Sequence, residues 1–229
     1  MNHSKQMTNN IIGITYKNSS KKNKLKITDE NREYVRKTNF NEDFWDSDSF
    51  PGYQGFKYDS RWEEVALFII DYFNLTNDSK ILDLGCGKGY LLYEIHKLLP
   101  QAEVHGVDIS KYAIDNAKKE IKEYIKCASS TNLPYDNNYF DFIYSLNVIY
   151  FMPEEECTRT INEINRIKTQ KSKTLIQVAS YRDEEEKRNM INWDLGILHK
   201  SIEEWKRYFK EVNYLGDYSF VIHGDKSNE

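Results

Sequence analysis

The chain has 229 residues and a formal net charge of −4 at pH 7. This length predicts one domain with a single sizeable core, while the net negative charge gives no support to a nucleic-acid partner. No apolar run approaches the roughly 18 residues of a membrane-spanning helix, so no membrane partner is expected.

Three cysteines are spread over the sequence, at Cys86, Cys127 and Cys157. Their spacing matches no zinc-binding pattern. An odd number of widely separated thiols also argues against a disulfide framework. We therefore expect no metal site and a reducing, cytoplasmic location.

The N-terminal part divides into a tail and an aromatic segment. Residues 1–24 hold five lysines, no acidic residue and one short apolar run, which predicts a mostly disordered tail and no signal peptide. Residues 25–62 are predicted to form a cap, because eight aromatic residues crowd into 40–62. Such a cap would close over a ligand, with Tyr53 and Tyr58 as substrate contacts. The alternative is a satellite hydrophobic cluster that touches no ligand.

From residue 60 onward, helical and strand patterns alternate. This alternation predicts an α/β fold with a doubly wound, mostly parallel sheet that carries helices on both faces. The domain would span 63–229, with an insertion at 180–200 and an edge strand or hairpin at 214–222. The apolar periodicity predicts helices over 60–74, 89–99, 110–122, 153–168 and 201–212, and strands over 79–84, 103–107, 124–128, 140–146 and 173–179.

The most informative segment is the glycine turn that follows the first predicted strand. It reads Asp83-Leu-Gly85-Cys-Gly87-Lys-Gly89 and leads straight into a predicted helix. A strand, a glycine turn and a helix place backbone N–H groups at a positive helix end, which predicts a cradle for a phosphate or carboxylate. A dinucleotide fingerprint would need a further glycine where Tyr90 stands.

Asp108 ends the second predicted strand, 23 residues after Gly85. An ionised carboxylate there can accept both hydroxyls of a ribose, and Ile109 would cover the adenine. The alternative role for Asp108 is that of a helix N-cap.

Together, the D-x-G-x-G-x-G run and the Gly106–Ser110 segment resemble motifs I and II of the class I S-adenosylmethionine (SAM) methyltransferases. The resemblance spans roughly residues 60–180 and implies SAM as the cofactor. In the family an acidic residue often contacts the adenine where Ser129 stands here, and the residue at the position of Asn147 lies beside the methyl donor. The implied cofactor-binding residues are Asp83, Gly85, Cys86, Gly87, Gly89, Asp108, Ile109, Ser129, Ser130 and Asn147.

The methyl acceptor is less clearly indicated. Residues 50–62 and 204–218 resemble methyltransferases of bacterial surface-sugar and capsule pathways, which implies a small polar acceptor: a sugar, a nucleotide-linked precursor or a phosphate or phosphoramidate group. Tyr181 and Arg182 follow a predicted strand on the ligand side, and Arg182 would bind a phosphate or carboxylate. A surface arginine paired with an acidic residue is the alternative.

Methyl transfer mainly requires alignment of the reacting atoms, and a hydroxyl acceptor also requires a general base. His199 is the first candidate and Tyr150 the second, although a packing role for His199 remains open. We expect O-methylation by a monomer or homodimer. The alternatives are a catalytically weak SAM-binding partner subunit and an N-methyltransferase of a natural product.

Overall fold

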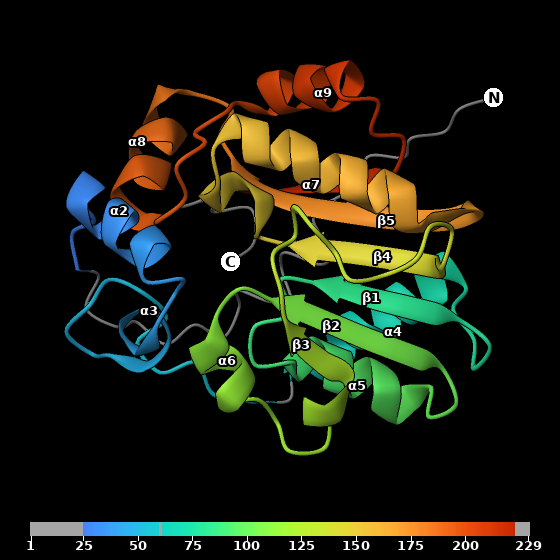
Figure 1. Ribbon diagram of the computed structural model, residues 1–229. Helices are drawn as coiled ribbons and strands as arrows, with labels where there is room; N and C mark the ends of the chain where they lie inside the picture. Colours follow the sequence, from blue (N-terminus) through green and yellow to red (C-terminus); the bar gives the residue numbers. More distant parts are fainter. Residues whose placement is uncertain (1–24, 60, 223–229) are drawn as a thin grey trace.

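The computed structural model describes residues 25–59 and 61–222, so the predicted tail at 1–24 lies outside the described residues. A six-stranded sheet forms the centre, in the order β3-β2-β1-β4-β5-β6, and every neighbouring pair is parallel (Figure 1). The prediction of a doubly wound parallel sheet is confirmed. The strands are β1 (Lys80–Leu84), β2 (Glu103–Asp108), β3 (Ile125–Cys127), β4 (Phe140–Leu146), β5 (Lys168–Ser180) and β6 (Asp217–Ile222).

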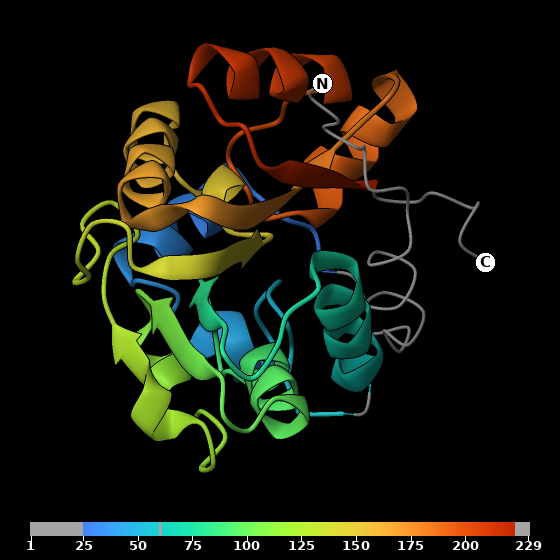
Figure 2. The same cartoon turned by 90° about the vertical axis from the view of Figure 1, so that its right-hand side faces the viewer.

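Helices cover both faces of this sheet (Figure 2). Side chains alternate between the faces along each strand, so Leu82 and Leu84 of β1 join one core cluster while Ile81 joins the other. The first cluster contains residues of α7 (Glu154–Ile167) and α9 (Ile202–Glu211), and the second contains residues of α4 (Arg61–Phe73) and α5 (Tyr90–Leu98). Both faces of the central strands are therefore buried, as is typical of a parallel sheet.

The predicted helix over 110–122 is wrong in its length. Only α6 (Lys111–Asp115) forms, and a turn and the short η1 (Lys122–Tyr124) replace the rest. The sequence after Asp115 offers few apolar positions to a helix, and the N–H of Lys118 donates to the carbonyl of Lys88 instead. The predicted capping box of the last helix is confirmed, since Ser201 and Glu204 exchange hydrogen bonds.

Two peripheral segments pack together over the carboxyl ends of the strands. The first holds α2 (Asp29–Lys37) and α3 (Glu42–Asp46), and the second holds α8 (Glu184–Trp193), which lies beside α2 (Figure 1). The short η2 (Ile149–Phe151) follows β4. We call residues 25–59 the cap. Its aromatic side chains form a cluster with Ala113 of α6 and with Leu195. None of the helices within the described residues is both long and apolar enough to cross a bilayer.

Arg32 joins the cap to the second segment. Its side chain is only 6% exposed. The guanidinium donates to the carbonyl of Gly196 at 3.2 Å, to that of Asp194 at 3.1 Å and to that of Ile191, and it pairs with Asp29 at 2.8 Å. One buried side chain thus donates to three carbonyls of the second segment.

We expect Arg32→Ala to lower the free energy of unfolding by about 2–4 kcal/mol, because buried acceptors without donors are costly. Urea denaturation measures this. The control is Lys37→Ala on the same helix, whose side chain is 73% exposed and whose loss should cost no more than about 0.5 kcal/mol. Equal losses in the two variants would contradict the anchoring role.

Candidate functional site

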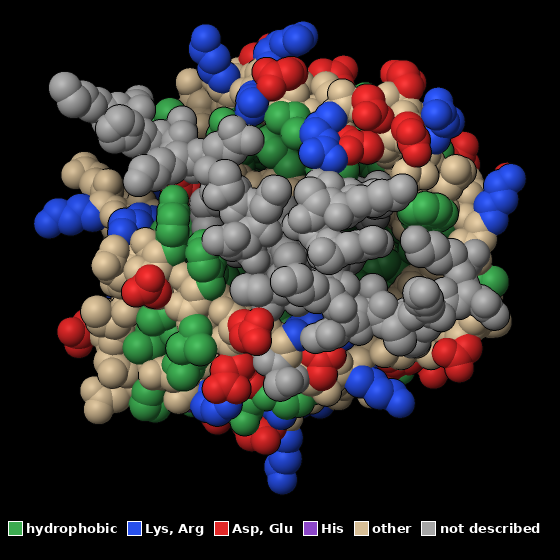
Figure 3. Space-filling view, turned by 180° about the vertical axis from the view of Figure 1, so that it is seen from behind, with side chains coloured by type: hydrophobic (Ala, Val, Ile, Leu, Met, Phe, Trp, Pro, Cys, Tyr) green, Lys and Arg blue, Asp and Glu red, His purple; other side chains and the backbone are tan. Residues whose placement is uncertain are grey.

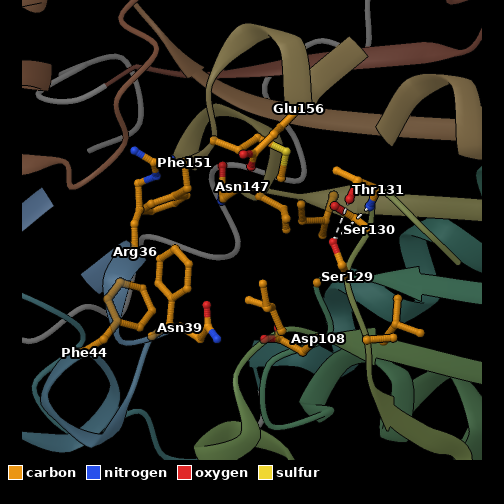
Figure 4. A pocket seen from close by; sticks show the side chains of 18 of the residues that line it. Arg36, Asn39, Phe44, Asp108, Ser129, Ser130, Thr131, Asn147, Phe151 and Glu156 are labelled. Carbon is orange, nitrogen blue, oxygen red and sulfur yellow. Dashed lines mark hydrogen bonds between the residues drawn. The ribbon is translucent and has the colours of Figure 1, made fainter. Parts of the chain in front are cut away.

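A cavity of about 430 Å³ lies between the carboxyl ends of the strands and the cap. Its size falls within the range of about 300–1,000 Å³ that is typical of small-molecule sites. The sheet side contributes the ends of β1, β2 and β4, and the cap contributes α2 and α3 (Figure 4). The residues that line it are Arg36, Asn39, Phe40, Phe44, Trp45, Tyr53, Gly85, Val107, Asp108, Ile109, Ala128, Ser129, Ser130, Thr131, Leu146, Asn147, Val148, Phe151, Met152, Glu156 and Arg159.

Asp108 ties two neighbouring strand ends together at this cavity. One carboxylate oxygen accepts the N–H of Gly87 at 2.8 Å, and the other accepts the N–H of Ser110 at 2.7 Å. Burial raises the pKa of this carboxyl, while the two N–H donors act against that rise. Ser110, and not Asp108, caps α6. Each carboxylate oxygen has two lone pairs, so Asp108 keeps acceptor capacity for a ligand hydroxyl.

The backbone N–H groups of the glycine turn donate mainly to acceptors within the protein. The N–H groups of Gly85 and Cys86 donate to the carbonyl of Val107 at 2.7 and 3.0 Å, and that of Gly87 donates to Asp108. These donors already have acceptors, so the predicted anion cradle is not formed by them. The glycines instead let other side chains pack closely against the turn. A Cβ on Gly87, at φ +55°, would lie 2.7 Å from the ring of Trp45.

The same turn carries Lys88, which holds the cap. Its ammonium group is nearly buried and pairs with both carboxylate oxygens of Asp46, at 2.7 and 2.8 Å, and with the carbonyl of Phe56 at 3.1 Å. Tyr112 donates to Asp46 at 2.9 Å. Burial opposes ionisation of Asp46, but the bonds from Lys88 and Tyr112 outweigh it and lower the pKa. Trp45 adds a bond to Ser110 at 3.0 Å.

Asp83 lies behind the turn and outside the cavity lining. The residue is 5% exposed, and burial, with a further contribution from the charge of Asp108, raises its pKa to about 8. The carboxyl is therefore mostly protonated at neutral pH, unlike a surface aspartate.

Asn147 follows β4 and lines the cavity in a left-handed conformation, with φ 59°. Its amide nitrogen donates to Gln177 at 3.2 Å, while its side-chain oxygen is buried and finds no donor among the described residues. A buried acceptor without a donor is costly unless a ligand supplies one. Asn147 therefore marks a place where a bound molecule would present an N–H or O–H group.

The structure brings together seven of the residues predicted from the sequence: Tyr53, Gly85, Asp108, Ile109, Ser129, Ser130 and Asn147. Cys86, Gly87 and Gly89 support the turn without lining the cavity. Tyr58 donates to Glu94, Tyr181 to Glu204 at 3.3 Å, and Arg182 pairs with Glu186. These three side chains are engaged elsewhere.

The two predicted bases also lie outside the cavity lining. The hydroxyl of Tyr150 donates to Asp194 at 3.1 Å. Burial, and secondarily the charge of Arg32, lowers the pKa of His199. Sequence reasoning did not select Arg36, Asn39, Glu156 or Arg159, which do line the cavity. They belong to no motif; Arg36, Glu156 and Arg159 carried only the amphipathic pattern of their helices, and Asn39 follows α2.

The chain resembles known proteins in sequence and in fold. The model of a methyltransferase domain matches residues 81–170. An uncharacterised protein of Methanocaldococcus jannaschii is 29% identical over 164 residues, which cover 70% of this chain and 68% of that protein. The malonyl-[acyl-carrier protein] O-methyltransferase of Legionella pneumophila is 29% identical over 92 residues, but these cover only 38% of this chain and 32% of that enzyme.

In fold, a geranyl diphosphate C-methyltransferase from Streptomyces coelicolor A3(2) superposes with a TM-score of 0.52 at 16% identity, over 64% of this chain and 58% of the other. That structure is a complex with S-adenosyl-L-homocysteine, geranyl diphosphate and Mg²⁺. Residues 81–170 thus match a methyltransferase domain, and the sequence similarity to methyltransferases supports a SAM-dependent methyltransferase. SAM is accordingly the cofactor.

The cavity of the methyltransferase domain fits this cofactor. SAM carries two ribose hydroxyls, which need acceptors, and an ammonium group, which needs a partner. The chain offers spare lone pairs on Asp108 and the unsatisfied oxygen of Asn147. Gly85 adds a wall without a side chain, and Ile109, 40% exposed, adds an apolar surface.

We expect Asp108→Asn to weaken SAM binding at least about a hundredfold, because hydrogen bonds to a charged acceptor contribute about 1.5–3 kcal/mol each. Isothermal titration calorimetry measures the affinity, and circular dichroism checks the fold. Asp115→Asn, which removes an exposed carboxylate from α6, is the control. Wild-type affinity in Asp108→Asn would remove the ribose assignment.

Asp83 should make stability depend on pH. Between its ordinary value of 3.8 and its folded pKa of about 8, the folded state binds more protons than the unfolded state, so the contribution to stability falls as pH rises through this window. Asp83→Asn should therefore gain stability relative to wild type from pH 5 to pH 8, by up to about 1 kcal/mol per pH unit. Urea denaturation at each pH tests this, with the exposed Asp78→Asn as control. A constant difference across the window would refute it.

Proposed function

We propose that the domain transfers a methyl group from SAM to a hydroxyl group of a small molecule that binds in the same cavity. The observation that carries this proposal is that strand ends and cap line the same cavity of about 430 Å³. Asp108 and Asn147 come from the strand ends, and Phe44 and Tyr53 come from the cap. A donor site and a covered space for an acceptor therefore adjoin.

When bound, SAM supplies an electrophilic methyl carbon with a neutral sulfur leaving group. The task left to the protein is to orient the acceptor and exclude water. The cap suits this task because Lys88 and Asp46 hold it against the glycine turn, and because Trp45 packs on Gly87. Orientation and water exclusion thus depend on one set of contacts.

A hydroxyl acceptor must also lose a proton. We assign its uptake to Glu156, in the first turn of α7, because its carboxylate lines the cavity near Asn147 (Figure 4). His199 and Tyr150, which the sequence favoured, lie outside the lining. A carboxylate at the reacting group can act as a general base.

The acceptor itself stays a prediction. The capsule and surface-sugar assignment rests on sequence resemblance, and the named relatives act on acceptors as different as an acyl-carrier protein and geranyl diphosphate. Acidic and basic side chains intermingle on the visible part of the back face (Figure 3), in keeping with a small-molecule acceptor over a nucleic acid. A catalytically weak SAM-binding subunit and an N-methyltransferase are the alternatives.

The test of the function is formation of S-adenosyl-L-homocysteine by the purified chain with panels of sugars, nucleotide-sugars, phosphoramidates and small amines. Turnover with a hydroxyl compound supports the proposal, whereas turnover with amines alone would favour the N-methyltransferase. SAM binding without turnover on any panel would favour the partner subunit.

Glu156→Gln should lower turnover of a hydroxyl acceptor by at least about a hundredfold while SAM affinity stays unchanged, because the amide cannot accept the proton. Glu155→Gln, next to it and 82% exposed on its side chain, is the matched control. His199→Ala is measured in parallel. A large loss in His199→Ala with little loss in Glu156→Gln would reverse the assignment.

A further inference from the structure

We propose that the methyl acceptor carries a carboxylate or phosphate group, that Arg36 binds this anion, and that an apolar part of the acceptor lies against Phe40, Phe44 and Phe151. This inference rests on the proposed function, and it adds the chemical class of the acceptor. It also moves anion recognition from Arg182, where the sequence placed it, to the cap.

Arg36 stands in the last turn of α2 and lines the cavity. Neighbouring cations on this helix are neutralised, since Arg32 pairs with Asp29 and Lys37 with Glu33. Among the described residues, no carboxylate lies within ion-pair distance of Arg36. A half-buried guanidinium facing a cavity without a counter-ion is a ready partner for an anion on a ligand.

Figure 4 shows where this charge lies. The Arg36 side chain reaches from α2 toward Phe151 on the cap side, while Asp108 and Ser129 occupy the sheet side. The anion site is thus separate from the residues that fit the ribose and adenine of SAM. Asn39, which follows α2, also lines the cavity.

The other arginines near the strand ends are already engaged. Arg159 lines the cavity but pairs with Glu155 at 2.9 Å, and Arg182 binds Glu186 through two of its nitrogens. An anion would have to displace a carboxylate from either of them. Arg36 requires no such exchange.

Three phenylalanine rings flank the charge. Phe40 lies edge-on to Phe44 at 5.0 Å between ring centroids and edge-on to Phe151 at 5.5 Å, and Phe44 is 6.1 Å from Phe151. All three line the cavity. An apolar wall beside a guanidinium that has no carboxylate partner among the described residues favours a ligand with an apolar body and a charged head over a sugar with polar groups all round.

Glu156 fixes the orientation of such an acceptor. Its carboxylate lines the same cavity and repels an anion, so the anionic head is favoured at Arg36 and disfavoured near Glu156. The hydroxyl group, which has a proton to give, is favoured at Glu156. Arg36 and Glu156 thereby favour a single direction of the acceptor.

The experiment uses the full chain saturated with S-adenosyl-L-homocysteine, at constant ionic strength. Phenyl phosphate, phenylacetate and benzyl alcohol are titrated by calorimetry into wild type, Arg36→Gln, Arg36→Lys and Lys37→Gln. We expect at least one of the two anions to bind wild type and Lys37→Gln alike, and Arg36→Gln at least about tenfold more weakly. Arg36→Lys should be intermediate, because it keeps the charge without the two-pronged geometry. Comparison of the two anions separates phosphate from carboxylate.

Three results would overturn the inference: equal anion affinity in Arg36→Gln and wild type, equal affinity for benzyl alcohol and the better anion, or no anion binding to wild type at millimolar concentration. Binding of S-adenosyl-L-homocysteine to every variant is measured first. If wild type fails to bind it, the proposed function falls and this inference with it. If wild type binds it and the anion results fail, only the inference about Arg36 falls.

Discussion

The half-buried carboxylate of Asp108 is the contact on which the site depends. It receives N–H groups from Gly87 on one side and Ser110 on the other, and so fixes the turn after β1 relative to the helix after β2. Without it, two loops at adjacent strand ends would have independent freedom, and fixing each residue of a loop costs about 1–2 kcal/mol in conformational entropy. The same oxygens retain lone pairs that face the cavity.

The glycine turn has a second task, which its sequence pattern conceals. Lys88 stands between two glycines and extends to Asp46 of the cap, and Gly87 lets Trp45 approach the backbone. A buried ion pair of this kind contributes little net stability, because desolvation offsets the attraction. The pair instead fixes the position of the cap, because any other placement would leave the two charges unpaired at a high cost in free energy. The glycine turn, which we propose as part of the SAM site, therefore also holds the cap in place.

The sequence predicts the features that depend on neighbouring residues, and it misses those that depend on contacts between distant parts of the chain. Strand and helix periodicity and the run from Asp83 to Gly89 are local, so the sheet and the positions of Asp108 and Asn147 at strand ends were predictable. The length of α6 was not predictable, because the N–H of Lys118 donates to the carbonyl of Lys88, a contact outside the helix that competes with its continuation. The presence of Arg36 and Glu156 in the cavity lining was not predictable either, because it depends on how the cap and α7 pack over the sheet. His199 looked catalytic by residue type alone.

The sheet and the cap contribute to the cavity in different ways. On the sheet side, hydrogen bonds among backbone groups and Asp108 fix the geometry, so side-chain changes there are tightly constrained. On the cap side, Arg36 lines the cavity from the short helix α2 and has no ion pair with a carboxylate of the described residues, so the cap does not depend on its charge. Substitutions there alter what the cavity selects at little cost to the sheet. We therefore propose that α2, α3 and the first turn of α7 determine which acceptor binds.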